Sequence, residues 1–372
     1  MKRRDFVTAL GIGAGAAALS ACGKKEPEDC TQQGTGEQTA SKEVIHWKMV
    51  TTWPKNFPGL GTAPERFAKN VAKMSNGRLQ IKVHGAGELV PALEAFSAVS
   101  AGTAQIGHGA AYYWKGKEPA AQFFAAVPFG LNAQEMNSWI HYGGGQQLWD
   151  EAYEQFNLKP FAGGNTGVQM AGWFRKKINS LEDLKGLKMR IPGLGGEVLK
   201  KLGGVPVNIP GGELFTALQT GTIDATEWVG PYNDLAFGLY KAAKYYYYPG
   251  WHEPGTTLEV IVNKKALQEL PEDLQAIVEQ AIRASNQDML DEYTARNNQA
   301  LNTLVNEHKV ELLKLPEDVL KQLHAVSNEV VQEVANTNEM TKKVYESFTK
   351  FAEQSRAYHM ISEQAFYETR TL

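Results

Sequence analysis

Segments typical of β-strands and of α-helices alternate along this chain, and the alternation occurs in two successive series before residue 240. The first series has expected strands at 44–51, 79–83 and 105–108 and expected helices at 62–75 and 93–101. The second has an expected helix at 135–156, then strands at 160–164, 169–175, 188–191 and 205–209, with helices at 180–183, 197–202 and 214–219. This alternation predicts parallel sheets wound by crossover helices. Two series predict an α/β fold of two lobes with a cleft.

The last hundred residues have an almost purely helical pattern. Helices are expected from Pro271 to about 307, from Pro316, and over 339–369. This helical extension, about 266–372, is expected to pack on the two lobes. The alternative is that part of it pairs with a second subunit.

The N-terminus is expected to lie outside the fold. The Arg3-Arg4 pair resembles a twin-arginine export signal, and Leu19-Ser20-Ala21-Cys22 resembles a bacterial lipobox. Residues 1–22 are therefore predicted to be a signal cleaved before Cys22, whose thiol would carry lipid. The alternative is an ordinary cleaved signal with an incidental cysteine. Residues 23–42 are polar and predict a flexible linker, so the folded domain is expected to span 43–372.

Charge and cysteine content exclude several classes of function. The net charge of −3 provides no basic field for nucleic acid. The chain has two cysteines, Cys22 and Cys30, and both precede the predicted domain, so disulfide, thiolate-zinc and thiol chemistry are not expected in it. The sequence also lacks the phosphate-binding loop, nucleophile-elbow and kinase patterns. A small-molecule ligand is the remaining expectation.

Polar and aromatic residues follow several of the predicted strands. The stretch "TGTIDATEWVGPYND" (220–234) ends a strand in Glu227 and Trp228, where small turn-forming residues are usual. Similar positions follow the other strands: Tyr112, Asn165, Gln169, Arg190 and Glu253. Ligands in wound α/β sheets bind outside the carboxyl ends of strands. We therefore expect these side chains to line the cleft.

Three of these residues indicate what the cleft binds. Arg190 offers a planar fork of donors that matches a carboxylate. Glu227 and Glu253 are like charges, so a shared buried site would need a cation. Oxygen ligands suit Na⁺ or Ca²⁺. The alternatives are a surface arginine and two solvated loop carboxylates.

His252 precedes Glu253, but no HExxH pattern or second nearby histidine accompanies it. We therefore expect it to form hydrogen bonds in the cleft, and we assign no histidine to a metal.

The order of these motifs resembles a known family over residues 44–370. "LEDLKGLKMRIPG" with Arg190 and "LFTALQTGTIDATEW" with Glu227 resemble the solute-binding proteins of TRAP (tripartite ATP-independent periplasmic) transporters. "EWVGPYND" and "KYYYYPGWHEPG" resemble the branch that binds 2-oxo and 2-hydroxy monocarboxylates with a cation.

The resemblance implies a two-lobed periplasmic binding protein with a hinge, which delivers pyruvate, 2-oxobutyrate or lactate-type acids to small and large integral membrane subunits. It implies that Arg190 holds the carboxylate, and that Asn165 and Tyr112 contact the ligand. Gln169, Glu227, the main chain of Trp228 and Glu253 would hold Na⁺ or Ca²⁺, which places Gln169 and Trp228 beside the ligand as well. It also implies a homodimer formed through the C-terminal helices.

His252-Glu253-Pro254 departs from the Trp-Glu-Gly expected in the best-known members of this branch, so the substrate side of the cleft could differ. Two alternative functions remain at this point. One is a secreted lyase or aldolase acting on a 2-oxo acid at the cation. The other is a ligand-binding partner of a membrane sensor.

Overall fold

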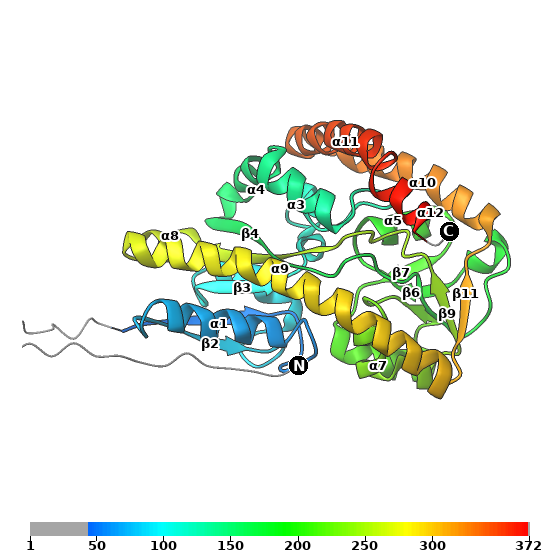
Figure 1. The fold of residues 1–372 in the computed structure, drawn as a ribbon, viewed down its shortest axis with the longest axis horizontal. Coiled ribbons are helices and arrows are strands. Elements are labelled where there is room, and N and C mark those ends of the chain that lie inside the picture. The colour runs from blue at the N-terminus through cyan, green and yellow to red at the C-terminus, as the bar shows by residue number, and fades with distance from the viewer. Residues whose placement is uncertain (1–43, 371–372) are drawn as a thin grey trace, which may run out of the picture. The chain divides into compact units, whose positions relative to one another are not determined.

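Two mixed β-sheets form the centre of the fold in a computed structural model that describes residues 44–370 (Figure 1). The first sheet has the order β2-β1-β3-β10-β4, and we call it and its helices the first lobe. Its strands are β1 (Ile45–Thr51), β2 (Leu79–His84), β3 (Ile106–Gly109), β4 (Leu158–Asn165) and β10 (Thr257–Asn263). Its helices are α1 (Thr62–Met74), α2 (Ala95–Ser100), α3 (Ala133–Tyr142), α4 (Gly145–Tyr153) and α8 (Lys264–Gln268).

The second sheet has the order β11-β9-β5-β8-β6-β7 and forms the second lobe. Its strands are β5 (Gly172–Phe174), β6 (Lys188–Arg190), β7 (Val205–Val207), β8 (Ala225–Thr226), β9 (Tyr245–Tyr248) and β11 (Glu311–Lys314). Its helices are α5 (Gly193–Lys201), α6 (Leu214–Thr220) and α7 (Pro231–Phe237). The C-terminal helices are α9 (Glu272–Asn302), α10 (Glu317–Ala335), α11 (Glu339–His359) and α12 (Glu363–Thr369). The two α/β lobes are confirmed.

The expectation of parallel sheets is wrong for both lobes. Strand β10 is antiparallel to β3 and β4, and β5 is antiparallel to β8 and β9. The chain passes from the first sheet to the second after β4 and returns to the first after β9. Strands β5 and β10 each follow such a passage, and the passage sets the direction in which the strand enters its sheet. Strand β10, which the sequence analysis does not predict, is buried at all seven residues.

Three other predicted elements differ from the structure. The helix expected at 135–156 is broken into α3 and α4 at Gly143 and Gly144, and Gly144 has a φ of 90°. The strand expected at 169–175 shortens to β5, because the main-chain N–H of Gln169 bonds to the carbonyl of Glu253 and not to a strand neighbour. The helical extension contains a strand, β11, which pairs in parallel with β9.

Helix α9 joins the lobes along one side of the molecule (Figure 1). It packs on β4 and α1 of the first lobe and on α7 of the second. Tyr293, on α9, donates a hydrogen bond of 2.7 Å to Asn233 of α7. Within residues 44–370, no helix combines the length and apolar character that crossing a bilayer requires. The twin-arginine pair, the lipobox, Cys22 and the linker lie outside the described residues and stay predictions.

The first lobe contains a fully buried carboxyl group, that of Glu259 on β10. It accepts hydrogen bonds from the indole of Trp114 and, at 3.0 Å, from the hydroxyl of Tyr153. Burial raises the pKa of Glu259 to about 8 from its ordinary value of 4.5, although the two hydrogen bonds oppose the shift. Because the folded pKa is raised, the stability contributed by the neutral carboxyl is complete below pH 4.5 and is lost as the pH rises through about 8.

We predict that Glu259→Gln reduces the loss of unfolding free energy between about pH 5.5 and about pH 8.5, because the amide does not ionise. Urea unfolding of wild type and variant at both pH values measures this. The matched control is Glu269→Gln, which changes an exposed side chain and should keep the wild-type pH dependence. Equal pH dependence in wild type and Glu259→Gln would contradict the prediction.

Candidate ligand and cation site

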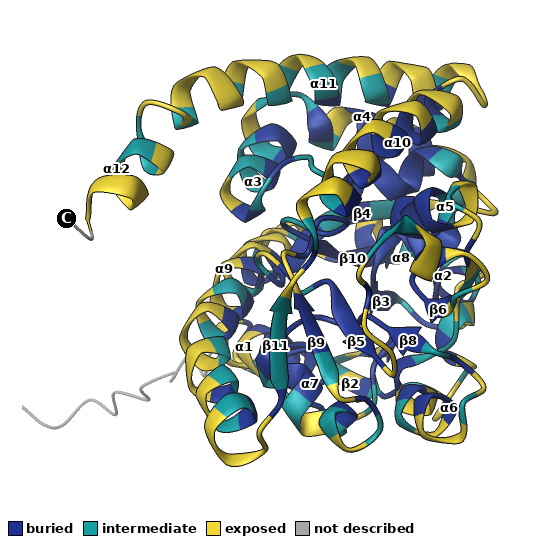
Figure 2. Cartoon of the chain, turned by 90° about the vertical axis from the view of Figure 1, so that its right-hand side faces the viewer, coloured by how far each residue is buried: buried dark blue, intermediate teal, exposed yellow. Residues whose placement is uncertain are grey.

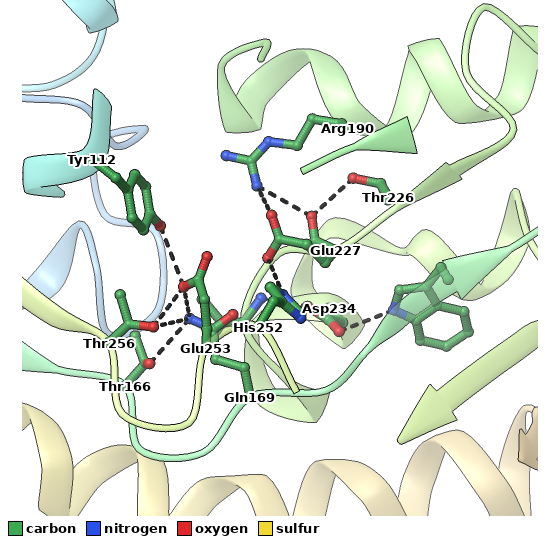
Figure 3. A network of polar contacts seen from close by, with 12 residues as sticks. Tyr112, Thr166, Gln169, Arg190, Thr226, Glu227, Asp234, His252, Glu253 and Thr256 are labelled. Atoms are coloured by element: carbon green, nitrogen blue, oxygen red, sulfur yellow. Dashed lines mark hydrogen bonds and ion pairs between the residues drawn. The ribbon is translucent and has the colours of Figure 1, made fainter. Parts of the chain in front are cut away.

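The predicted site residues come from strand ends and from the two passages between lobes (Figure 3). Arg190 ends β6, and Glu227 directly follows β8. Gln169 lies on the passage after β4, and Glu253 lies on the passage after β9. The structure brings these four side chains together, and each is at most 3% exposed. The charges of Arg190, Glu227 and Glu253 are therefore shielded from solvent and depend on partners inside the protein.

Arg190 and Glu227 form a buried ion pair between strand ends of the second lobe. Nη1 of Arg190 donates to Oε1 of Glu227 and, at 3.3 Å, to its main-chain carbonyl. Nε donates to the carbonyl of Ile209 at 3.4 Å, and Nη2 donates to the hydroxyl of Tyr113 at 3.1 Å. Burial lowers the pKa of Arg190, but the negative charge of Glu227 more than offsets this, so the pKa is raised and the guanidinium stays charged.

Most of the N–H donors of Arg190 are engaged by the protein itself in this structure. A guanidinium has five N–H donors, and four are already engaged. One N–H of Nη2 remains, next to the hydroxyl of Tyr113. A hydroxyl that accepts from Arg190 can still donate its own hydrogen. Arg190 and Tyr113 together therefore offer a carboxylate two donors, one from each lobe.

Three hydrogen-bond donors surround one carboxylate oxygen of Glu253. Its Oε2 accepts from Thr256 at 2.5 Å, from Gln169 Nε2 at 2.8 Å and from the hydroxyl of Tyr112 at 3.4 Å. Burial, together with the charge of Glu227, raises the pKa of Glu253 to about 7. The single positive charge of Arg190 therefore cannot balance the two negative charges of Glu227 and Glu253 when both carboxylates are ionised.

Several buried atoms at this site have no hydrogen-bond partner. They are Oε1 of Gln169, Oε2 of Glu227, Nε1 of Trp228 and both ring nitrogens of His252. Leaving such a group unpaired costs about 1–3 kcal/mol. Oε1 of Gln169 and Oε2 of Glu227 are oxygen ligands of the kind that Na⁺ and Ca²⁺ take. The residues present therefore fit a bound cation.

Trp228 and Asn165 lie beside this cluster in different ways. The indole of Trp228 covers the guanidinium of Arg190, which lies 5.0 Å from the ring centre, and contacts Trp53 edge-on. Asn165 is buried at the end of β4, where it donates to Gly255 and Thr257 and accepts from the N–H of Gly167. Its polar atoms hold the passage between lobes and form no hydrogen bond with the other predicted site residues.

The sequence assigned the ligand contact to Tyr112 and not to Tyr113. The hydrogen bonds expected for His252 are absent, because neither ring nitrogen has a partner. Tyr112 and Tyr113 are adjacent in a 3₁₀ helix, Ala111–Trp114, in which successive side chains point in different directions. The hydroxyl of Tyr112 therefore contacts Glu253 and that of Tyr113 contacts Arg190. Their shared sequence signal, two tyrosines after a strand, does not separate the two roles.

The chain is similar to a known family of bacterial binding proteins over most of its length. Residues 49–338 match the bacterial extracellular solute-binding proteins of family 7, DctP. The chain belongs to this family. It is a TRAP solute-binding protein, as the order of its motifs predicted. Proteins of this class are periplasmic and serve membrane permeases.

Three relatives show the extent of the similarity. A monocarboxylate 2-oxoacid-binding periplasmic protein from Nostoc sp. is 43% identical over 98% of each chain. A TRAP periplasmic solute-binding protein from Pseudoalteromonas atlantica, solved with sodium and pyruvate, has a TM-score of 0.86 and 46% identity, covering 88% of this chain and 99% of its own. A TRAP solute-binding protein from Bordetella bronchiseptica, a mixed-occupancy dimer with calcium and picolinate, has a TM-score of 0.86 and 39% identity, covering 88% and 97%. These structures confirm the two-lobed fold with long C-terminal helices.

One glycine brings the two passages between lobes into contact. At Gly250 a Cβ atom would overlap the main-chain carbonyl of Gln169. Only a residue without a side chain lets the segment before Glu253 approach Gln169 this closely. The relative position of two site residues therefore depends on Gly250.

We predict that Gly250→Ala lowers the midpoint of thermal unfolding of this solute-binding protein by several degrees, because the added methyl group pushes Gln169 from its place. Differential scanning fluorimetry measures the shift. Gly116→Ala is the matched control, since a Cβ there meets nothing within 4 Å, and it should unfold as wild type does. An unshifted midpoint for Gly250→Ala would contradict the prediction, because it would show that Gly250 and Gln169 can move apart at no cost in stability.

Proposed function

We propose that this TRAP solute-binding protein captures a small 2-oxo or 2-hydroxy monocarboxylate together with Na⁺ or Ca²⁺ and delivers it to the two membrane subunits of its transporter. The observation that carries the proposal is the buried Arg190–Glu227 pair with unpartnered oxygens of Glu227 and Gln169 beside it. A guanidinium attracts the carboxylate, and the oxygens attract the cation. An acid with an oxygen at C2 satisfies both at once, because that oxygen completes the shell of the cation.

Each predicted site residue has a role in this proposal. Arg190 and Tyr113 hold the ligand carboxylate, and Tyr112 and Asn165 line the cleft. Gln169, Glu227, the main-chain carbonyl of Trp228 and Glu253 hold the cation, and the indole of Trp228 forms a wall. When bound, the cation would supply positive charge that neutralises the second carboxylate and orients the C2 oxygen.

Named relatives support the chemical class of the ligand. The Nostoc protein is named for 2-oxo monocarboxylates, and the Pseudoalteromonas structure contains pyruvate with sodium. The Bordetella structure contains an aromatic carboxylate with calcium. We propose that binding occurs without turnover, so that incubation with pyruvate yields no new product by NMR. Export by the twin-arginine signal of residues 1–22 and lipid anchoring through Cys22 belong to the same proposal.

We predict that pyruvate, 2-oxobutyrate or lactate raises the thermal midpoint of the full chain when Na⁺ or Ca²⁺ is present, and that Glu227→Gln lowers the affinity for the acid at least about ten-fold. The substitution removes a charge shared by the cation and Arg190. Scanning fluorimetry and calorimetry on chelator-treated protein measure both effects. Glu269→Gln is the control and should bind as wild type. No stabilisation by any acid with either cation would contradict the proposed function.

The C-terminal helix α12 supports the proposed homodimer. It has no buried residue, and Figure 2 shows it exposed or half-buried along its length. Large apolar side chains at least 58% exposed cluster on it and just before it: Tyr358, Met360, Ile361, Phe366 and Tyr367. A second copy that covers this surface would remove apolar area from water. We propose that the helix packs on the partner subunit.

We predict that removing residues 362–372 converts a dimer into a monomer without changing the fold, measured by light scattering after size exclusion. A single-site control is Met74→Asp, which changes a half-exposed apolar residue on α1 and should leave the dimer intact. A full-length chain that is already monomeric, or a truncated chain that stays dimeric, would contradict the proposed interface.

A further inference from the structure

His252 is a buried side chain that the proposed function leaves unused. It lies on the passage after β9, directly before Glu253, and is 1% exposed. Neither Nδ1 nor Nε2 has a hydrogen-bond partner. In either tautomer, a neutral imidazole therefore holds one unpaired N–H and one unpaired lone pair away from water.

The ring lies beside both acidic residues of the site (Figure 3). Nε2 is 3.5 Å from Oε2 of Glu227, which is too long for a good hydrogen bond, and that oxygen is itself unpartnered. Glu227, His252 and Glu253 each offer one ligand atom, and the three atoms lie within 4.8 Å of one another. Among residues 44–370, no other group of three histidine, cysteine or acidic side chains has ligand atoms this close together.

The donor set differs from that of a pure oxygen site. Na⁺ and Ca²⁺ take oxygen ligands, whereas imidazole nitrogen suits zinc, nickel, copper and iron. Zinc sites take imidazole nitrogen and carboxylate oxygen among their ligands, and sites with three protein ligands keep a fourth position open. Oε1 of Gln169 or an oxygen of the bound acid could fill that position.

We infer that the cation site accepts a divalent transition metal of the Zn²⁺ type, held by His252, Glu227 and Glu253. The inference rests on the proposed function, because it places the metal where the carboxylate-binding cation would lie. It assigns His252 a role that the sequence analysis, which gave no histidine to a metal, did not foresee. The bound acid would then meet a metal with a nitrogen ligand.

The test compares Zn²⁺ and Ca²⁺ binding by calorimetry on the chelator-treated full chain, with no acid present. Wild type should bind Zn²⁺ at least about ten-fold more tightly than Ca²⁺. His252→Gln should lose at least about ten-fold in Zn²⁺ affinity and change its Ca²⁺ affinity by less than about three-fold, because the amide keeps an oxygen and loses the nitrogen. His308→Gln, at an exposed histidine, is the matched control for surface binding and should match wild type.

X-ray absorption of the Zn²⁺-loaded wild type needs no variant and should show scattering from one imidazole. Absence of that signal, or an unchanged Zn²⁺ affinity in His252→Gln, would overturn the inference. If His252→Gln instead weakened pyruvate binding equally with every cation and left metal affinity unchanged, His252 would contact the acid and the inference would also fall.

The same preparations separate this failure from failure of the proposed function. Wild type that binds pyruvate with Ca²⁺ or Na⁺ but shows no preference for Zn²⁺ overturns the transition-metal inference alone. Wild type that binds neither an acid nor any cation overturns both.

Discussion

The buried ion pair of Arg190 and Glu227 is the interaction on which the rest of the site depends. Both side chains are at most 1% exposed, so removing either partner would leave a charge without solvent or counterion. Glu227, Ile209 and Tyr113 together accept hydrogen bonds from four of the five N–H groups of Arg190. The single remaining N–H limits how a carboxylate can approach.

The pair forms because β6 and β8 are parallel neighbours, with Arg190 opposite Thr226 and Glu227 next along the chain. Beside the pair, the chain passes between the lobes after β4 and again after β9. Those passages bring Gln169 and Glu253 to the strand ends that carry Arg190 and Glu227, and Gly250 lets the passages touch. Helix α9 packs on both lobes, and Tyr113 of the first lobe contacts Arg190 of the second. Contacts that bridge the lobes through the site explain how ligand binding and lobe closure can be coupled. Through Tyr113, Arg190 thus connects the two lobes.

Local signals in the sequence were enough for much of the fold. The helices expected at 180–183 and 214–219 depend on such short-range features: a capping box of Ser180 and Asp183 begins the first, and left-handed Gly221 ends the second. Strand direction was not predictable in this way, because β5 and β10 take their orientation from the passages between lobes. Strand β11 pairs with β9 across more than sixty residues, and nothing within its four residues separates it from the helices around it.

Local signals at strand ends were also enough to predict which residues come together in the site. The rule on strand ends placed Arg190, Glu227, Gln169 and Glu253 in one cleft, and the family resemblance implied a role for each. The choice between Tyr112 and Tyr113 depends on the turn of a 3₁₀ helix, and the position of His252 depends on how the second passage bends. Side-chain direction at such positions follows from tertiary packing.

In the proposed function, acid and cation bind as one unit around Arg190 and Glu227. Calorimetric titration of pyruvate at increasing Ca²⁺ concentration tests it most directly. The affinity for pyruvate should rise with Ca²⁺, and pyruvate should raise the affinity for Ca²⁺ by the same factor, as linkage requires. A pyruvate affinity that stays constant across the Ca²⁺ series, and across a parallel Na⁺ series, would contradict it.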